Sequence, residues 1–375
     1  MIRGIHLTLM MGPVVPVPVP KVVLEALDAV EVQHNTDQPS VFQLTFKFSS
    51  KSILNTILLL MGDIGPIIRT VLVVTHNGLP TVLMDGVITD QQVTPDVQSG
   101  QTTLTLTGED LSKLMDLIQV KGIPYPGMPP SARAAVILAK YAAFGIIPVV
   151  IPSILLDVPL PTSRIPTQNV KDRAYLNRLA NEVGYVFYVD PGPVPGTSTA
   201  FWGPEVKIGL GVPQPALSIN MDAHTNVESL NVRFDGSRKT LPILNIHNPE
   251  TKITIPIPLP DVTPLSPPLG LVPPPPKNIQ FLETGRLSPI QAALIGIAKA
   301  AKSADVVSAT GSLNVLRYGH ILKARQLVGL RGAGIAFDGL FFVKSVKHQL
   351  KRGEYKQDFT LTRNALVSNV PAVPV

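Results

Sequence analysis

The sequence predicts an α+β fold that is mainly β-structure, and three observations support this prediction. Apolar and polar residues alternate over much of the first 110 residues, helical spacing dominates the middle, and alternation returns in the C-terminal third. Side chains on one face of a strand repeat every second residue, whereas those on one face of a helix recur every three or four residues. The order therefore indicates two β-rich regions joined by a mostly helical region. The two β-rich regions have similar turns, which hints at an internal duplication.

The first β-rich region contains four strand-like segments. Residues 41–48 place phenylalanine and leucine on one face and polar side chains on the other. The dipeptide Asn77-Gly78 separates the apolar runs 71–75 and 81–89. This dipeptide favours a type I′ turn, because both of its residues accept positive φ. Residues 102–107 alternate leucine with threonine and form the fourth strand-like segment. With the Asn77-Gly78 turn, these segments predict a sheet built from hairpins.

Four helices are expected, over residues 107–118, 131–145 and 169–184 and from residue 288 onward. The first begins at a capping-box-like pair, in which Asp110 follows Thr107 by three positions. Serine, asparagine and proline are typical of helix starts, and glycine of helix ends. Apolar residues recur at helical spacing at Leu111, Leu114, Met115 and Ile118, then Tyr175, Leu176, Leu179 and Val183, and finally Ile290, Leu294, Ile297 and Ala301.

The C-terminal third is predicted to form strands at residues 321–330, 341–350 and 355–362, separated by glycine-containing turns. Proline is the outlier of the composition, with 38 residues, ten of which lie between positions 253 and 276. Proline lacks a backbone N–H donor and favours extended geometry. We interpret residues 253–276 as a surface insertion or semi-rigid spacer outside any core. The alternative is a ligand for a proline-recognising module.

The composition indicates a protein that buries much of its surface, either internally or against partners. Hydrophobic residues make up 45% of the 375 residues and charged residues only 15%, whereas about 25% charged is usual. The formal net charge is +6. One basic cluster stands out, which we interpret as a solvated strand face and turn, with nucleic acid or an acidic partner as the alternative. It consists of Lys344, Lys347, Lys351, Arg352 and Lys356.

Several classes of protein are disfavoured by what the sequence lacks. There is no cysteine, so disulfides, thiolate metal sites and thiol nucleophiles are excluded. Prolines at positions 13, 16, 18 and 20 argue against a signal peptide. The longest apolar run, residues 141–156, is shorter than the roughly 20 residues of a membrane span, and prolines interrupt it. We therefore expect a soluble protein, cytoplasmic on synthesis.

Four stretches together carry a resemblance to a known family. They are residues 74–116, with a Gly-x-Asp-Leu step into a helix, residues 172–185, a helix that ends at a glycine before an aromatic strand, residues 227–234, and residues 338–363. Their order and spacing resemble the central hub proteins of contractile tails. That family includes phage late-control D proteins and the N-terminal hub regions of VgrG proteins in contractile injection systems.

The resemblance implies a homotrimer whose subunits each carry two tube-like β-barrel domains, plus a linking domain and a Pro-rich insertion. Three subunits would then present six similar domains to a tail tube or tube-initiator protein, and threefold symmetry to a separate spike protein. Wedge components of the baseplate are further expected partners, and the protein would reside in the assembled particle, such as a virion baseplate. The expected divisions are 1–118 for the first tube-like domain, 119–199 for a linking α/β domain, 200–240 with 312–365 for the second tube-like domain, 241–311 for the insertion with one helix, and 366–375 for a C-terminal tail.

Catalytic and metal-binding patterns were sought, and none is assigned: we predict no catalytic, cofactor-binding or metal site and no small-molecule substrate. The histidines form no pair at metal-ligand spacing. Carboxylates such as Glu109, Asp110 and Glu182 are interpreted as helix-capping or solvated groups, not as a glycosidase pair. The run Gly329–Gly334 has the wrong glycine order for a dinucleotide loop and is interpreted as a hairpin turn.

The leading hypothesis is therefore a structural, non-catalytic tail hub. The alternative is a cell-wall hydrolase carried at the tail tip, which would need a cleft with paired carboxylates. A third hypothesis, a binding module for glycan or nucleic acid, predicts exposed aromatic side chains. Aromatic residues total only 5%, and Trp202 is the sole tryptophan.

Overall fold

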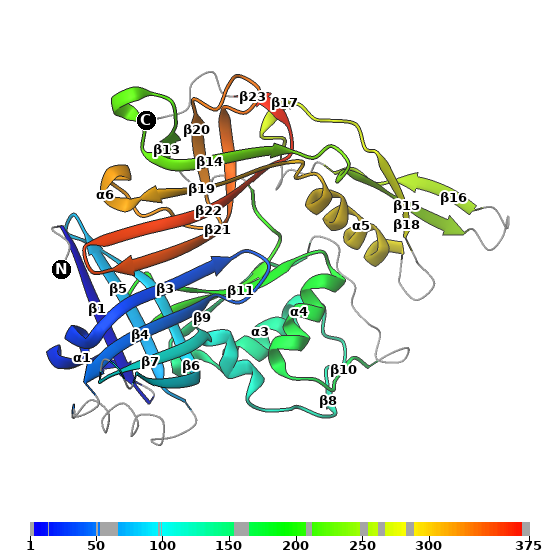
Figure 1. Ribbon diagram of the computed structural model, residues 1–375. Helices are drawn as coiled ribbons and strands as arrows, with labels where there is room; N and C mark the ends of the chain where they lie inside the picture. Colours follow the sequence, from blue (N-terminus) through cyan, green and yellow to red (C-terminus); the bar gives the residue numbers. More distant parts are fainter. Residues whose placement is uncertain are drawn as a thin grey trace.

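The computed structural model describes residues 4–13, 15–49, 52, 67–96, 98, 100–153, 165–207, 212–247, 254–261, 267–282 and 289–369. Within this part of the chain, a 13-stranded sheet dominates the fold, and four smaller sheets accompany it. Figure 1 shows the sheet running through both the N-terminal and the C-terminal strands. The predicted mainly-β α+β class is confirmed.

The N-terminal strands form block 1, which occupies one half of the main sheet. Alternating burial along its strands follows the sequence pattern, and the expected hairpin is present, with Asn77 at φ 50° and Gly78 at φ 78°. Its elements are β1 (Ile5–Gly12), β2 (Val17–Pro18), α1 (Lys21–Ala26), β3 (Leu27–Asn35), β4 (Val41–Ser49), β5 (Arg69–His76), β6 (Leu79–Asp96) and β7 (Gln101–Asp110).

A linking region follows block 1 and has its own apolar core around the buried Trp202. The expected helix after residue 107 is a short 3-10 helix, and Asp110 is itself the cap, because its carboxylate accepts from the Ser112 N–H at 2.9 Å. The stripe of α4 is buried as predicted. The elements are η1 (Leu111–Asp116), β8 (Ile123–Pro124), α3 (Pro130–Ala139), η2 (Ala142–Phe144), β9 (Ile146–Val150), β10 (Thr167–Gln168), α4 (Asp172–Glu182), β11 (Val186–Pro191) and β12 (Ser198–Gly203).

The C-terminal strands form block 2, the other half of the main sheet. The strand expected at 321–330 is confined to β20, because the preceding residues form a turn. Block 2 comprises β13 (Gln214–Ser218), η3 (Asp222–His224), β14 (Val227–Phe234), β19 (Val307–Asn314), α6 (Val315–Tyr318), β20 (Leu327–Arg331), β21 (Gly339–Lys351) and β22 (Glu354–Arg363), and β23 (Leu366–Ser368) follows it.

An insertion between β14 and β19, here called the arm, projects from block 2 except at residues 270–272, which pair with residues 366–368 beside that block (Figure 1). The proline-rich strand β16 lies at an edge of its sheet and is exposed, as strand prolines require. The expectation that residues 253–276 stay outside any core is wrong in part, because Leu259 and Leu269 are buried in small apolar clusters. The arm contains β15 (Thr240–His247), β16 (Thr254–Pro258), β17 (Gly270–Val272), β18 (Asn278–Leu282) and α5 (Pro289–Ser303).

Two separate tube-like barrels are not confirmed. Among the described residues no sheet closes on itself, and the strand path runs β14-β19-β22-β21-β3-β4-β7-β6-β5-β1-β2. The reason is the pairing of β21 with β3, which joins the two blocks edge to edge. One apolar core accordingly contains side chains of both blocks.

Candidate assembly interface

The main sheet contains the same strand arrangement twice. Block 1 has the order β3-β4-β7-β6-β5-β1, and block 2 has the order β14-β19-β22-β21-β20-β13. Read in this way, each strand of block 1 has a counterpart at the same place in block 2, in the same order along the chain. The last pair differs, because β1 is antiparallel to β5 whereas β13 is parallel to β20.

Irregularities in the ladders fix the correspondence residue by residue. The β3–β4 ladder has a bulge between Leu27 and Ala29, and the β14–β19 ladder has one between Val227 and Ser229. The β6–β7 and β21–β22 ladders each contain a second bulge, at Thr89 and Lys344 respectively. Each bulge inserts one residue that the partner strand does not match. Two bulges at matching places make chance similarity a poor explanation, so the blocks are structural repeats.

The two blocks meet where β3 pairs with β21. The ladder places Val32 opposite His348 and His34 opposite Val346. The rings of His34 and His348 meet edge to face, with centroids 5.4 Å apart, and both are buried. His348 Nδ1 lies 2.8 Å from the Tyr355 hydroxyl. Burial lowers the pKa of both imidazoles, that of His34 to about 4, so the joint holds neutral rings.

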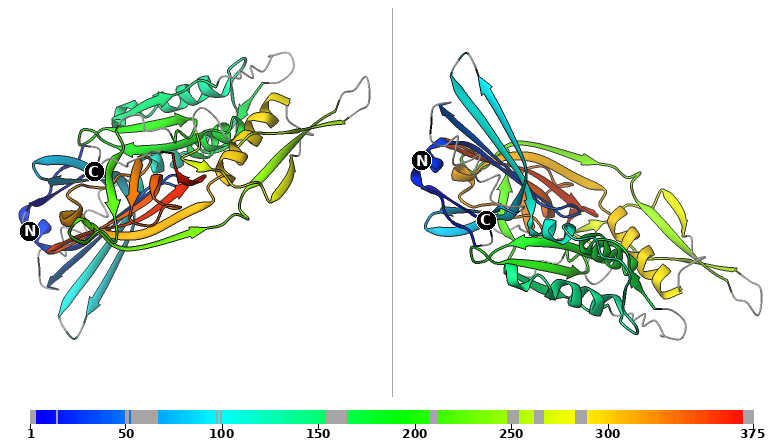
Figure 2. Two further views of the ribbon diagram at one scale, coloured as in Figure 1. Left: turned by 90° about the horizontal axis from the view of Figure 1, so that it is seen from above. Right: turned by 90° about the horizontal axis from the view of Figure 1, so that it is seen from below.

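The repeat leaves two strand edges open among the described residues. β14 is counterpart to β3, yet it pairs only with β19, and the outer side of residues 89–95 in β6 pairs with nothing that the structure describes. The counterpart of that β6 segment is the part of β21 that pairs with β3. Figure 2 shows the β6–β7 hairpin projecting from the rest of the molecule. Each block therefore lacks the neighbour that the other has at the joint.

Side chains at the two open edges are more exposed than their counterparts at the joint between the blocks. Val93 is 40% exposed and Phe234 is 42% exposed. Their counterparts at the joint are His348 and His34, which are 2% and 9% exposed. The same positions are thus covered at one joint and uncovered at the open edges. Exposed strand edges bearing apolar side chains are sites of pairing with another chain.

One face of the sheet is polar, and its cations are held by neighbouring carboxylates. Three pairs occur there within one chain: Lys47 with Asp28 at 2.9 Å, Lys347 with Glu31 at 2.8 Å, and Lys356 with Glu228 at 3.1 Å. The rest of this face is rich in hydroxyl and amide groups, at positions such as Gln33, Gln43, Thr45, Thr103, Thr105, Asn231, Thr310, Ser312 and Thr360. The basic cluster predicted from sequence mostly lies here, on a solvated strand face as expected.

The polar face is hollowed where block 2 meets block 1. A hollow of about 530 Å³ is lined by residues of β3, β14, β19, β21 and β22, including Gln33, Asn231 and Asp358. Side chains from five adjacent strands line one hollow only if the sheet curves toward them. The polar face is therefore the concave side there, and the apolar core lies on the convex side.

Two arginines that sequence reasoning missed connect the linking region to the blocks. Arg69 donates to both carboxylate oxygens of the buried Asp85, at 2.7 and 2.6 Å, and to the Gly196 carbonyl at 2.8 Å. Arg325 of block 2 donates to the Asp190 carboxylate and lies 4.0 Å from the centroid of the Tyr188 ring. No local pattern marks either arginine, because their partners are distant in sequence.

The two ends of the sheet differ in what is repeated. At one end, here called the hairpin rim, the β6–β7 and β21–β22 hairpins turn, and these turns are counterparts. At the other end, the short β3–β4 connection corresponds to the arm, which joins β14 to β19. The linking region packs at that end against β6 and β7. Figure 1 shows the β21–β22 turn beside α1 at one side and the arm and α3–α4 toward the other. One end is thus duplicated within the chain, whereas the other is not.

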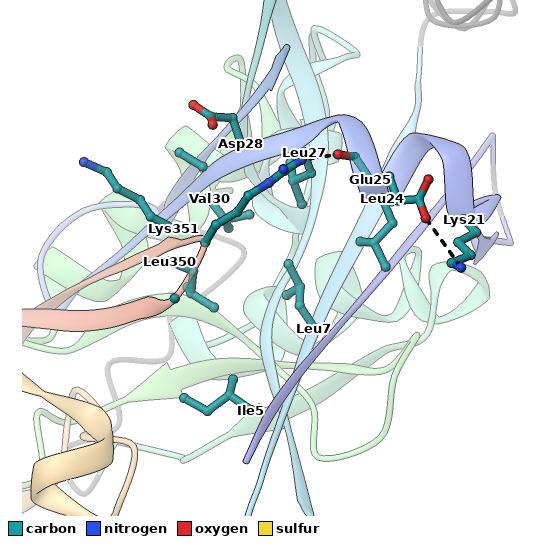
Figure 3. Close-up of a pocket in the computed structure, with 13 residues that line it drawn as sticks. Ile5, Leu7, Lys21, Leu24, Glu25, Leu27, Asp28, Val30, Leu350 and Lys351 are labelled. Carbon is teal, nitrogen blue, oxygen red and sulfur yellow. Dashed lines mark hydrogen bonds and ion pairs between the residues drawn. The ribbon is translucent and has the colours of Figure 1, made fainter. Parts of the chain in front are cut away.

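An apolar pocket of about 550 Å³ lies at the hairpin rim (Figure 3). Leu7, Leu24 and Leu350 face it from β1, α1 and β21. Its charged groups stand at the mouth, where Lys21 and Glu25 form an ion pair at 3.5 Å. Such a lining suits apolar contact and lacks the convergent polar groups of a catalytic site.

The carboxylates considered for catalysis have structural partners. Glu109 contacts Arg173 at 2.8 Å and Lys113 at 3.3 Å, and despite partial burial these cations hold its pKa below the usual range. Asp110 also accepts from the Ser40 N–H, at 2.6 Å, and burial raises its pKa. Glu182 pairs with Arg178 at 3.3 Å. Glu109 and Asp110 thus hold different elements together, whereas Glu182 pairs within its own helix.

Metal-binding clusters and membrane-spanning helices are both absent from the part of the chain that the structure describes. No group of three or more histidine, aspartate or glutamate side chains there is arranged to hold a metal ion. No helix in the same residues combines the length and apolar character needed to cross a membrane. The run Gly329–Gly334 spans the end of β20 and the following turn, as interpreted.

Comparison with known proteins places the fold. No protein-family model and no curated protein sequence matches the chain. Among solved structures, a tail protein from Neisseria meningitidis superposes with a TM-score of 0.63 at 14% identity, covering 96% of this chain and 97% of that one. The 43 kDa tail protein of prophage MuSo2 from Shewanella oneidensis gives 0.62 at 14% identity, covering 96% and 99%.

A third solved structure is more distant. The E. coli c3393 protein, described as a type VI secretion component with similarity to T4 bacteriophage tail proteins gp27 and gp5, gives a TM-score of 0.54 at 12% identity. The superposition covers 93% of this chain and 77% of the c3393 chain. At these identities, the comparisons show that the chain shares its fold with phage tail and type VI secretion proteins.

Proposed function

We propose that the chain is a structural hub of a contractile phage tail or contractile injection system. In this role three copies form a ring that joins a sixfold tail tube to a threefold spike. The observation that carries the proposal is the repeat, which doubles the hairpin rim and leaves the opposite end single. The shared fold with tail proteins supports the same role.

The symmetry follows from counting what each rim presents. A ring of three chains offers its hairpin turns six times and its arm and linking region three times. Mating a threefold ring with a sixfold tube requires two near-equivalent surfaces in each chain, because otherwise half of the tube contacts would be unmade. The hairpin rim is therefore the proposed tube-facing side, and its apolar pocket is available for contact. The single end would face the spike and wedge components.

The concave polar face would line the channel of such a ring. Exposed lysines that lack a counter-charge would attract polyanions and acidic protein surfaces. Here three lysines of this face, Lys47, Lys347 and Lys356, are paired with carboxylates of the same chain. A hydrated face with paired charges suits passage of material with little adhesion.

Native mass spectrometry and an averaged map of the assembled particle test the proposal. We expect three copies of this chain for every six tube subunits in the adjoining ring, and blocks 1 and 2 related by a rotation of about 60° about the ring axis. A monomer inside the assembled particle would sink the hub proposal. Two blocks related by a rotation far from 60° would remove the adaptor role.

A further inference from the structure

We propose that copies of this chain join through their two open edges, with residues 90–95 of β6 pairing antiparallel with residues 230–235 of a neighbour, which are the last residues of β14 and the one that follows it. This inference rests on the proposed ring and specifies its joint. The occupant of each edge is a second copy of the same chain. The joint between the two blocks within one chain supplies the register.

The register transfers through the matched ladders. Within the chain, Gln349 of β21 lies opposite Glu31 of β3. The β6–β7 and β21–β22 bulges make Thr94 the counterpart of Gln349, and the β3–β4 and β14–β19 bulges make Asn231 the counterpart of Glu31. Thr94 of one copy is therefore placed opposite Asn231 of the next. The same step places Val93 opposite Val232 and Gln92 opposite Arg233.

The side chains on the core side of the joint fit this register. Val93 and Phe234 occupy the places of His348 and His34, whose rings touch at the joint within the chain. Both are about two-fifths exposed in the single chain. Pairing the edges covers them with each other, so an apolar contact takes the place of the histidine pair. Burial of exposed apolar area is the main favourable term in such association.

The charges on the polar side centre on Arg233. Its side chain is 75% exposed, and its ion pair with Asp235 in the same chain is long, at 3.6 Å. Across the proposed joint, Asp90 lies directly opposite Asp235, by the same step that puts Ser345 opposite Asn35 within the chain. Like charges directly opposite each other repel, but Arg233 is diagonal to Asp90 and close to Asp235, so its cation lies between the two carboxylates and offsets their repulsion.

Disulfide trapping tests the register directly, because the chain contains no cysteine of its own. We expect Thr94→Cys with Asn231→Cys in one chain to form covalent trimers under mild oxidation, seen on non-reducing gels. The matched control, Thr94→Cys with Ser229→Cys, places the thiols diagonally and keeps Arg233. Diagonal neighbours lie roughly 7–8 Å apart, too far for a disulfide without backbone movement.

Charge removal gives a second measurement that does not depend on disulfide geometry. Arg233→Gln alone should weaken trimer association by about tenfold, since each joint then keeps Asp90 opposite Asp235 with no cation between them. The double variant that adds Asp90→Asn should regain most of the loss. Circular dichroism of each variant checks that the chain still folds.

The outcomes separate this inference from the hub proposal. A trimer by native mass spectrometry that forms no disulfide from the opposite pair, or bridges both pairs equally, overturns the joint and leaves the hub in place. Failure of the double charge variant to recover also overturns the joint. A chain that stays monomeric in assembled particles overturns the hub and the joint together.

Discussion

The histidine pair at the joint between the blocks should make the fold sensitive to acid. His34 and His348 are buried as neutral rings, and burial is the main cause that lowers the pKa of each. The charge of Asp190 opposes this effect on His34, and that of Arg325 adds to it. In the unfolded chain both imidazoles titrate near pH 6.5. The unfolded state therefore binds more protons below pH 6.5, and stability falls as the pH falls from there toward about 4.

The magnitude for His34 follows from its pKa of about 4. Moving from pH 8 to pH 5 protonates the unfolded ring and leaves the folded one mostly neutral, which costs about 2 kcal/mol of unfolding free energy. His348 acts in the same direction. Urea titrations followed by far-UV circular dichroism at several pH values would measure the loss.

Substitution isolates the contribution of the buried ring. His34→Phe removes the titrating group with a residue that already stands at the counterpart position, Phe234, so about 2 kcal/mol of the loss between pH 8 and pH 5 should vanish. The matched control is His6→Gln at an exposed position, which should keep the wild-type pH dependence. If the His34→Phe curve ran parallel to the wild-type curve, burial of His34 would not be the cause of the acid sensitivity.

Two further substitutions test the packing that underlies the interface, both by the midpoint of urea unfolding. Asp85→Asn breaks the buried bidentate pair with Arg69 and should lower the free energy of unfolding by about 3 kcal/mol or more. The control Asp28→Asn breaks an exposed pair and should lower it by under about 1 kcal/mol. Equal losses in the two variants would contradict the role assigned to burial. Gly311→Ala should cost about 1–3 kcal/mol, because its added Cβ would lie 2.3 Å from the Ser229 carbonyl oxygen, and an unchanged midpoint would show that the β14–β19 ladder is looser than described.

Local physics made part of the fold predictable from sequence. The turn at Asn77-Gly78 needs two residues that accept positive φ, and this requirement can be recognised from the two adjacent residues alone. The buried stripe of α4 and the alternation of β4 are equally local, since each reflects a single element with one covered face. The mainly-β class follows from such elements. Asp110 was placed correctly at a helix start, although Thr107 belongs to the preceding strand.

The interface depends on contacts that no local pattern encodes. The ladder between β3 and β21 joins residues more than 300 positions apart, so the fusion of the two blocks into one sheet could not be read from periodicity. The bulges that align the repeats are single-residue shifts inside ordinary alternating strands. Arg325 contacts two other regions of the chain, through the Asp190 carboxylate and the Asn35 carbonyl oxygen, yet its own loop sequence contains no distinctive motif. The sequence nevertheless hinted at duplication through the similar style of its hairpins.

The two repeats differ in the side chains at the joint within the chain and at the open edges, and the way each pair of edges is held together explains the difference. At the joint within the chain, covalent connection keeps the two edges together, so the ladder tolerates a buried histidine pair that contributes little apolar area. Edges that must find each other between separate chains have no such help, and a larger share of their association must come from apolar burial. The open edges carry Val93 and Phe234 at those same places. Pro95 lies opposite Leu230 in the proposed pairing and has no backbone N–H, so that position contributes one hydrogen bond fewer. Apolar burial at Val93 and Phe234 is therefore the main contribution that we expect to hold this joint.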